Sequence, residues 1–450
     1  MMQQHIQHRC DTLWRYHLAI GYGDSNEEEN GLSKVAKGRY TAEAVAGFTH
    51  RTAMEEAARC LLCHDAPCSQ GCPAGTDPAR FIRSIRFRNV KGAAETIREN
   101  NVLGGSCARV CPYDRLCEEA CSRCGIDRPI EIGKLQRYAI EQEKLFGMKT
   151  LTAPDKKLPG KVACIGAGPA SLACAAELAK KGYRTTVFER QAKAGGMLTY
   201  GIVPARLPQS VVDHDIAQVK GLGVRFRFNS DVTAADLEDY DAVFIGIGLW
   251  GANIPPVEGA GLDGVFAAVD FLQEARTKKK KFDPGRRVIV VGGGDVAVDC
   301  AVTAKLLGAE DVKIIYRRSI EEAPGNMVEF QYALSLGIGI TTGMAPDSLK
   351  GDGHVETAEF KGYRDEDARM VLSADTVVFA TGQNAEDITA IVPVKVDKNG
   401  SIRAPKGRAG GRFFAAGDIV NSGKTVVEAV AAGKEAAAAM IAYLEKKGVR

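Results

Sequence analysis

The sequence has no long hydrophobic run and no excess of charge of one sign. No stretch approaches the 18 apolar residues of a membrane-spanning helix, and the polar N-terminus has no apolar segment typical of a signal peptide. The net charge is +3, from 59 basic and 56 acidic residues, which gives no electrostatic support for binding nucleic acid or an anionic membrane. We therefore expect a cytoplasmic protein that binds neither.

Cysteine, by contrast, is abundant. The chain has 450 residues, too many for one hydrophobic core, and 13 of them are cysteines. Nine cysteines lie between Cys60 and Cys124. Disulfides are rare in a reducing compartment, so this clustering indicates bound metal. The other four are expected to be ordinary small residues of the tail, strands and helices: Cys10, Cys164, Cys174 and Cys300.

The cysteine-rich segment reads as helical, with helical patterns at 78–87 and 92–99. Its first cysteines resemble the ferredoxin run, in which three close cysteines hold one [4Fe-4S] cluster and a fourth, followed by proline, reaches a second cluster. In this chain the run is formed by Cys60, Cys63, Cys68 and Cys72.

A later block supplies further thiolates from Cys111, Cys117 and Cys121. Two four-iron clusters need eight ligands, and these seven cysteines leave one place open, for Cys107, Cys124 or a ligand that is not a thiolate. Zinc bound by four thiolates is the competing interpretation. True CxxC pairs are scarce, however, and cysteine followed by proline favours iron–sulfur clusters.

The stretch KVACIGAGPASLACAAELAKKGYRTTVFER has the pattern of a dinucleotide-binding unit. A strand at 162–165 leads into Gly166 and Gly168, where the bare backbone can approach a pyrophosphate. A helix predicted from Pro169 to Lys181 would offer its N-terminus to the phosphates. Ser171, at the third fingerprint position, is small enough for close helix–strand packing.

The second strand of this unit, at 184–188, ends in Glu189. A carboxylate at that point binds ribose hydroxyls, so the site favours an adenosine whose hydroxyls are free. The glycine turn Gly195-Gly196-Met197 then follows and could lay backbone against a flat ring system.

The same pattern returns in RVIVVGGGDVAVDC, with Gly292, Gly294 and Ala297 at the fingerprint positions. The next strand, at 312–316, ends in Arg317 and Arg318. A guanidinium pair suits the 2′-phosphate of NADPH, although two glutamates nearby, at 321 and 322, weaken that preference.

Later segments indicate how the domains are nested. Buried strands are expected at 241–248 and 376–382, and RFFAAGD at 412–418 precedes a helix that starts around Thr425. A strand that ends in Gly417-Asp418 beside a helix N-terminus again suits a cofactor. Because it follows the second fingerprint, the first nucleotide domain is predicted to be discontinuous, and the lysine run 278–281 to be a solvated crossover.

The predicted fold is α/β, with an N-terminal α-helical double [4Fe-4S] domain followed by two nested Rossmann-like domains. The expected division is an extension at 1–40, the iron–sulfur domain at 41–155, an FAD domain at 156–265 and 383–450, and an NAD(P)H domain at 266–382. Two dinucleotide sites in one chain imply a hydride passed from nicotinamide to flavin.

These residues resemble the FAD/iron–sulfur subunit of bacterial NAD(P)-dependent dihydropyrimidine dehydrogenase, the PreT type. The resemblance runs from about Ala57 onward and is densest in CLLCHDAPCSQGCPAGTDPARFIRSI, NVLGGSCARVCPYDRLCEEAC, GAGPAS, GGGDVAVDCA and AAGDIV. It implies one cluster on Cys60, Cys63, Cys68 and Cys121. It implies a second on Cys72, Cys111, Cys117 and Gln136 of the motif IGKLQRY, with Cys107 and Cys124 as bystanders.

The resemblance also implies the cofactor sites. FAD would be held by Gly166, Gly168, Pro169, Ala170, Ser171, Glu189, Gly196, Met197, Arg206, Val232, Gly417, Asp418 and Thr425. The nicotinamide cofactor would be held by Gly292, Gly293, Gly294, Asp295, Val296, Arg317, Arg318, Ala380, Thr381 and Gly382. Pro324 falls near the place of a family arginine that grips the 2′-phosphate, and bacterial subunits of this type often use NADH, so NADP and NAD both stay open.

By the same resemblance, nicotinamide C4 donates a hydride to flavin N5, and electrons then leave singly through the two clusters. No side chain of this chain is expected to act as acid, base or nucleophile. Since no β/α barrel follows, the pyrimidine site is expected on a partner, an FMN/iron–sulfur subunit of the PreA type, in a heterotetramer that interconverts uracil or thymine and their 5,6-dihydro forms.

Two rival functions share part of this pattern. The small subunit of glutamate synthase and related ferredoxin:NADP oxidoreductases have the same layout but deliver electrons elsewhere. The segment ARFIRSI and LQRY with Gln136 favour the pyrimidine enzyme. A non-enzymatic cluster-bearing scaffold is disfavoured by two intact dinucleotide fingerprints.

Overall fold

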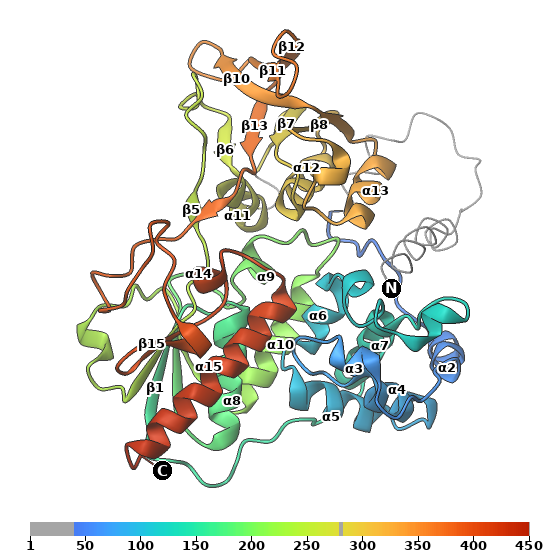
Figure 1. The fold of residues 1–450 in the computed structure, drawn as a ribbon, viewed down its shortest axis with the longest axis vertical. Helices are drawn as coiled ribbons and strands as arrows, with labels where there is room; N and C mark the ends of the chain where they lie inside the picture. The colour runs from blue at the N-terminus through green and yellow to red at the C-terminus, as the bar shows by residue number, and fades with distance from the viewer. Residues whose placement is uncertain (1–39, 279–281, 450) are drawn as a thin grey trace, which may run out of the picture.

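The computed structural model describes residues 40–278 and 282–449 (Figure 1). The predicted N-terminal extension, apart from its last residue, and most of the predicted lysine crossover lie outside the described residues. The described chain forms three regions, which we name the helical, the six-stranded and the five-stranded regions.

The helical region comes first in the chain, at the lower right of Figure 1. It contains α2 (His50–Ala58), α3 (Pro67–Gln70), α4 (Pro78–Arg86), α5 (Val90–Asn100), α6 (Gly104–Val110) and α7 (Ile132–Leu145). The helical patterns predicted at 78–87 and 92–99 correspond to α4 and α5. Phe81, Ile82 and Ile85 of α4 pack with Leu135 and Tyr138 of α7 because apolar residues at helical spacing share one face.

The six-stranded region begins with the first fingerprint. Its elements up to the crossover are β1 (Lys161–Ile165), α8 (Pro169–Lys181), β2 (Arg184–Phe188), α9 (Met197–Tyr200), α10 (Gln209–Gly221), β3 (Arg225–Arg227) and β4 (Ala242–Ile245). It resumes with β15 (Arg408–Gly410), β16 (Phe413–Ala415), α14 (Asp418–Asn421) and α15 (Val426–Lys446). The strand order is β15-β16-β4-β1-β2-β3, parallel except for β15, so one sheet is built from two separate parts of the chain.

The five-stranded region is inserted between those parts and forms the upper lobe of Figure 1. It contains β6 (Val265–Ala267), α11 (Ala268–Lys278), β7 (Arg287–Val291), α12 (Asp295–Leu307), β8 (Asp311–Tyr316), α13 (Met327–Ser335), β9 (Gly339–Thr342) and β13 (Thr376–Phe379). The parallel order is β6-β13-β7-β8-β9. Two nested Rossmann-like units after a helical region match the predicted fold class.

A small antiparallel sheet, absent from the sequence-based prediction, covers one side of the five-stranded region. Its strands are β10 (Met344–Lys350), β11 (Thr357–Gly362) and β12 (Arg369–Ser373). The two chain crossings to the six-stranded region, β5 (Gly251–Ala252) and β14 (Gln383–Asn384), pair antiparallel. A two-residue ladder is therefore the backbone link between the α/β regions.

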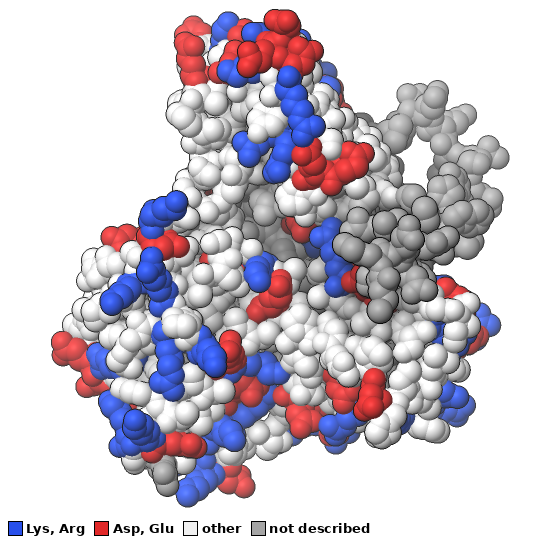
Figure 2. All heavy atoms as spheres, in the orientation of Figure 1, with Lys and Arg blue, Asp and Glu red and all other residues white. Residues whose placement is uncertain are grey.

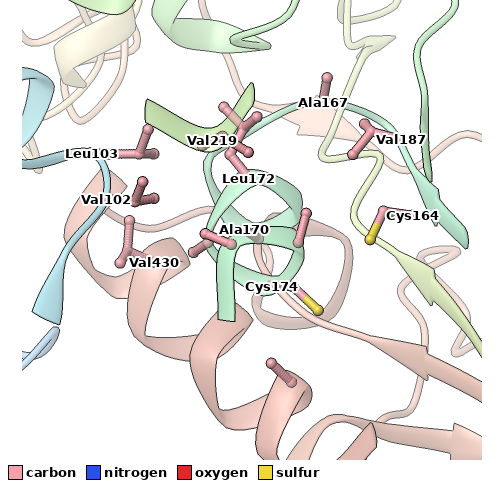
Figure 3. Packing of buried hydrophobic residues seen from close by; sticks show 14 of the residues in the cluster. Val102, Leu103, Cys164, Ala167, Ala170, Leu172, Cys174, Val187, Val219 and Val430 are labelled. Carbon is pink, nitrogen blue, oxygen red and sulfur yellow. The ribbon is translucent and has the colours of Figure 1, made fainter. Parts of the chain in front are cut away.

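The helical and six-stranded regions share one hydrophobic core. Val102 and Leu103, from the loop between α5 and α6, pack in the same cluster as Ala170 and Leu172 of α8 and Val430 of α15 (Figure 3). Helix α15 lies along α8 (Figure 1). These two regions are thus joined by buried apolar surface, the main source of stabilisation between packed elements.

The surface agrees with the balanced composition. On the face shown in Figure 2, acidic and basic side chains are interspersed, especially over the upper lobe. Among the described residues, none of the helices combines the length and apolar content needed to cross a bilayer.

Candidate cofactor sites

One cavity of the helical region is lined by four cysteines that the sequence assigned to one cluster. Cys60 and Cys63 precede α3, Cys68 lies on it, and Cys121 precedes a short 3₁₀ turn. The other walls of this cavity are mainly apolar, including Leu61, Ala66, Pro67, Ala79, Ile82, Ile130 and Ile132. The four thiols therefore line one largely apolar cavity.

A second cavity is lined by the other predicted set. Cys72, Cys111 and Cys117 border it together with Gln136 of α7. Cys107 borders it too, although the resemblance made it a bystander, whereas Cys124 is exposed and borders neither cavity. The fold thus brings the two predicted ligand sets to two separate places.

The amide of Gln136 has a fixed orientation. Its side chain is 8% exposed, and Nε2 donates a hydrogen bond of 2.7 Å to the carbonyl oxygen of Gly104. Because only the NH₂ end can donate, the oxygen Oε1 is the end left for an iron atom. The geometry therefore suits a neutral oxygen ligand.

The described thiols line their cavities without converging on a single point. A zinc ion holds its sulfurs at about 2.3 Å, hence close to one another. Within residues 40–278 and 282–449, no three Cys, His, Asp or Glu side chains converge closely enough for a single metal ion. Each set instead surrounds a cavity, which fits an iron–sulfur cluster better than the competing zinc interpretation.

The buried thiols have raised pKa values. Burial, with neighbouring thiols adding, raises the pKa of Cys68 to about 11. A hydrogen bond with Cys107 and burial raise the pKa of Cys111 well above its usual value, and burial raises that of Cys117. Such thiols keep their protons at neutral pH, so binding iron as thiolates must release protons.

The first fingerprint forms the turn that a pyrophosphate needs. Gly166 has φ +86°, and a Cβ there would lie 2.8 Å from the carbonyl oxygen of Gly246. Gly168 is the N-cap of α8, where a Cβ would meet only that oxygen, at 3.9 Å. Gly196, φ +53°, backs directly onto Gly168. A close turn with open space above a helix N-terminus fits a dinucleotide.

Glu189 stands at the end of β2 as predicted. Its carboxylate accepts hydrogen bonds from the backbone N–H groups of Ala167 and Gln191, each at 2.8 Å. A carboxylate has about four acceptor positions, so two remain for ribose hydroxyls. Burial raises the pKa of Glu189, and the two N–H groups oppose that rise.

The remaining residues predicted for FAD lie around this turn or support it. Ser171 is buried and its hydroxyl donates to the carbonyl of Gly246, so it serves helix–strand packing. Gly417 is packed against Ala170, and the pKa of Asp418 is raised by burial. The others are Pro169 at the start of α8, Met197 at the start of α9, buried Val232, and Thr425, which caps α15 through Glu428.

Arg206 lies at the junction of all three regions. Its Nη1 donates to Glu329 of α13 at 2.8 Å and is 3.7 Å from Asp299 of α12, while Nη2 donates to the carbonyl of Val110. Its guanidinium is thus committed to protein groups. Burial, reinforced by Asp299 and Asp295, raises the pKa of Glu329 to about 8 although Arg206 opposes the rise.

The second fingerprint has the same local form. Gly292 has φ +154°, a Cβ on Gly293 would collide with the Tyr316 ring, and Gly294 is the N-cap of α12. Asp295 accepts from the N–H of Asn326 at 2.6 Å. Val296 follows in the first turn of α12. At the far side, Ala380, Thr381 and Gly382 lead from β13 into β14.

The arginine pair after β8 lies on aromatic rings. The guanidinium of Arg317 is 5.5 Å from the ring centre of Tyr363, and that of Arg318 is 5.7 Å from Tyr316. The Nε of Arg318 is buried without a hydrogen-bond partner. The nearby Glu322 forms its ion pair with Arg364, at 2.9 Å, and not with Arg317 or Arg318.

Several residues of the second cavity escaped the sequence-based assignment. Asn101, Thr76 and Tyr113 line it, as does Val427, the one lining residue contributed by the six-stranded region. Lys434 of α15 donates to the carbonyls of Ala74 and Asn100, both at 2.6 Å. The only signal in the sequence was that Asn101 opens the segment NVLGGSC, which carries part of the family resemblance.

Comparisons with known families agree with this geometry. The model described as "Pyridine nucleotide-disulphide oxidoreductase" matches residues 160–433, and the model for dihydropyrimidine dehydrogenase domain II, 4Fe-4S cluster, matches residues 37–147. The solved FprA from Mycobacterium tuberculosis, as a His57Gln mutant, matches with a TM-score of 0.57 at 18% identity, over 64% of this chain and 86% of that one. The fold and sites therefore define a pyridine nucleotide-disulphide oxidoreductase joined to an iron–sulfur domain.

Two curated relatives cover most of the chain. The Escherichia coli K12 "NAD-dependent dihydropyrimidine dehydrogenase subunit PreT" is 44% identical over 90% of this chain and 98% of its own length. The "Glutamate synthase [NADPH] small chain" of the same organism is 32% identical over 88% and 93%. The chain belongs to the PreT family of dihydropyrimidine dehydrogenase subunits. It is an NAD(P)-dependent flavin and iron–sulfur oxidoreductase, which feeds electrons from the nucleotide into clusters.

Proposed function

We propose that this chain is the electron-input subunit of a dihydropyrimidine dehydrogenase. It takes electrons from NAD(P)H and passes them to an FMN/iron–sulfur partner subunit, of the PreA type, that interconverts uracil or thymine and their dihydro forms. The 44% identity to PreT over nearly its whole length supports this reaction over that of the glutamate synthase relative. We propose a heterotetramer in the cytoplasm, where reducing conditions keep thiols available for iron.

The observation that carries the proposal is the pair of separate cavities lined by the two predicted ligand sets. We propose two [4Fe-4S] clusters, one on Cys60, Cys63, Cys68 and Cys121, the other on Cys72, Cys111, Cys117 and Gln136. When bound, nicotinamide, flavin and clusters supply the hydride and one-electron chemistry. The protein orients them and excludes water, and none of its side chains acts as acid, base or nucleophile.

The positions of the cavities suggest the direction of electron flow. The second cavity is bordered by Val427 of α15, next to Thr425 and the proposed FAD site. The first is lined by the helical region alone, and its lining residue Leu61 is 45% exposed. We propose that electrons pass from the six-stranded region through the second site to the first, and that the partner docks over the rim around Leu61.

The domain division belongs to the same proposal. We assign the iron–sulfur domain to 41–155, the FAD domain to 156–265 and 383–450, and the NAD(P)H domain to 266–382. The discontinuous six-stranded sheet and the β5–β14 ladder support these boundaries. For the second nucleotide site we propose NADH as donor, because the PreT relatives are named NAD-dependent and Pro324 packs near Gly294.

The test is anaerobic purification of the chain with its co-expressed partner, followed by uracil reduction with NADH or NADPH. About eight irons and one FAD on this chain, with NADH-dependent turnover only when the partner is present, are expected. Iron and FAD without pyrimidine turnover would transfer the assignment to a glutamate synthase-like or ferredoxin-linked enzyme. Zinc in place of iron would overturn electron transfer altogether.

A further inference from the structure

One buried side chain that lines the second cavity has a hydrogen-bond donor without an acceptor in the described part of the protein. Asn101 lines this cavity and is 1% exposed. Its Nδ2 has no hydrogen-bond partner. By contrast, among the described residues that line the first cavity, none has a buried side-chain nitrogen or oxygen without a partner.

The orientation of the Asn101 amide is fixed by its other hydrogen bonds. Its Oδ1 accepts from the N–H of Leu103 at 2.9 Å. Its backbone N–H donates to Ile97 at 2.7 Å, and its carbonyl accepts from Gly104 at 3.1 Å. Only the oxygen end of an amide can accept a hydrogen bond from a backbone N–H. The NH₂ end of Asn101 must therefore point away from the N–H of Leu103.

An amide NH₂ held in a buried place without a partner is destabilising, because it has lost its hydrogen bonds to water and gained none in return. The loop from Asn101 to Gly104 nevertheless fixes it there, and also presents the Gly104 carbonyl that orients Gln136. One short loop therefore positions both a neutral oxygen ligand and a free donor at the same cavity. A bound group with acceptor atoms would remove the cost.

We propose that Nδ2 of Asn101 donates a hydrogen bond to a sulfur atom of the cluster held in the second cavity, and thereby raises that cluster's reduction potential. The inference rests on the proposed function, since it requires a cluster at this site. Hydrogen bonds to cluster sulfurs stabilise the reduced, more negative state. Thr76 acts in the same sense, because its N–H lies 3.5 Å from Sγ of Cys72.

This inference assigns Asn101 a positioning and tuning role. The neutral ligand Gln136 and the donor Asn101 both favour the reduced state of the second cluster, while the first cavity holds four thiolates and no unmet donor. The second site would therefore have the higher potential, which suits a first acceptor of electrons from the flavin.

The test uses the complete chain with its partner, purified anaerobically. Asn101→Leu removes the donor without adding a charge, and Asn101→Asp keeps the oxygen that receives the Leu103 N–H. Asn100→Leu is the matched control, because the Asn100 amide donates to the Thr96 carbonyl instead. Iron content and redox titration followed by electron paramagnetic resonance give the potential of each cluster separately.

We expect both Asn101 variants to retain their iron and to show a lower potential for the second cluster only, with Asn100→Leu unchanged. Pulsed resonance on protein labelled with ¹⁵N-asparagine should show a nitrogen coupling to the second cluster that Asn101→Leu abolishes. An unchanged potential in Asn101→Leu with the cluster present, or a coupling that survives, would overturn the inference. A wild-type chain with no second cluster would instead refute the proposed function.

Discussion

Glu143 and Glu329 each pair with an arginine where two regions meet, yet the pKa of Glu143 is lowered and that of Glu329 is raised. Although burial raises the pKa of Glu143, hydrogen bonds from His214 and Arg98 and the charge of Arg98 hold it at about 2. Burial raises that of Glu329 to about 8. The two pKa values differ because Glu143 accepts hydrogen bonds from more donors than Glu329 does.

At the junction of the helical and six-stranded regions, Arg98, Glu143 and Asp215 form a buried network of paired charges. Arg98 is fully buried and donates to Glu143 at 2.7 Å and to Asp215 of α10 at 2.6 Å. Asp215 also accepts from the backbone of Ser106. At the other junction, Arg206 pairs with both Glu329 and Asp299, and Asp295 adds a third carboxylate, with Arg276 as a second cation near Asp299. One junction is built to stay closed, whereas the other keeps a surplus of carboxylates.

Functionally, the contrast separates two needs of the enzyme. In the proposed electron path, electrons cross from the six-stranded to the helical region over a fixed distance, which a shared core and the Arg98 ion network would maintain. In the proposed function the nucleotide enters and leaves between the two α/β regions. These regions are linked by the β5–β14 ladder and by polar contacts, among them those of Arg276 with Thr199 and Gln209.

The largest effect should come from Glu143→Gln. The change leaves the buried Arg98 short of one carboxylate, which costs about 3 to 5 kcal/mol. The apparent melting temperature of the complete protein should fall markedly. Glu99→Gln, which breaks an exposed pair with Arg80, should cost less than about 1 kcal/mol. Equal effects of the two variants would contradict the contrast between buried and exposed pairs.

Lys434→Met should have the next largest effect. Within the described part of the chain, the ammonium group of Lys434 forms no ion pair with a carboxylate. It donates hydrogen bonds to the carbonyls of Ala74 and Asn100 across the junction. Leaving such buried carbonyls unpaired costs about 1 to 3 kcal/mol. Limited proteolysis should then cut the linker at 151–160 faster than in wild type. Lys424→Met, on the same side of the fold but half exposed, serves as the control and should leave the cleavage rate unchanged.

The smallest effect should be that of Glu329→Gln at about pH 4, where the carboxyl group is largely protonated in both the folded and the unfolded chain. With a folded pKa near 8, Glu329 is mostly protonated at pH 7, and an amide imitates it. Because this pKa is raised above the unfolded value, the carboxyl group stabilises the fold fully at low pH, and that stability is lost as pH rises toward 8. Wild type should therefore lose melting temperature relative to the variant between about pH 4.5, the unfolded pKa, and about pH 8, the folded pKa. Parallel curves for both proteins would show that Glu329 is not the group that titrates.

Much of the fold was predictable because its signals are local. The bounds of α8 and β2 agree with the prediction, since Gly168 and Gly182 mark the ends of the helix. The antiparallel sheet β10–β12 was missed because no fingerprint marks it. Sequence could not reveal the Arg98 network either, as Asp215 lies 117 residues further along the chain.

The candidate sites show the same limit. Cysteine spacing separated only Cys72 from the three cysteines before it. The family resemblance supplied the two full ligand sets that the fold brings to two cavities. The spacing could not show that Cys107 also borders the second cavity, nor that Asn101 presents a free donor there, because both facts depend on how one loop folds back. Which of the proposed ligands bind iron stays a prediction.

The discontinuity of the six-stranded sheet has a consequence for biosynthesis. A ribosome releases the helical region and β1–β4 first, then the whole five-stranded region, and only afterwards β16 and α15. Until then the β4 edge has no β16 beside it, and the second cavity lacks its wall at Val427. The second cavity and the proposed flavin site can therefore be completed only after α15 is made, whereas the first cavity, lined by the helical region alone, can form earlier. Nascent chains that stall within the insert would present an open sheet edge to chaperones.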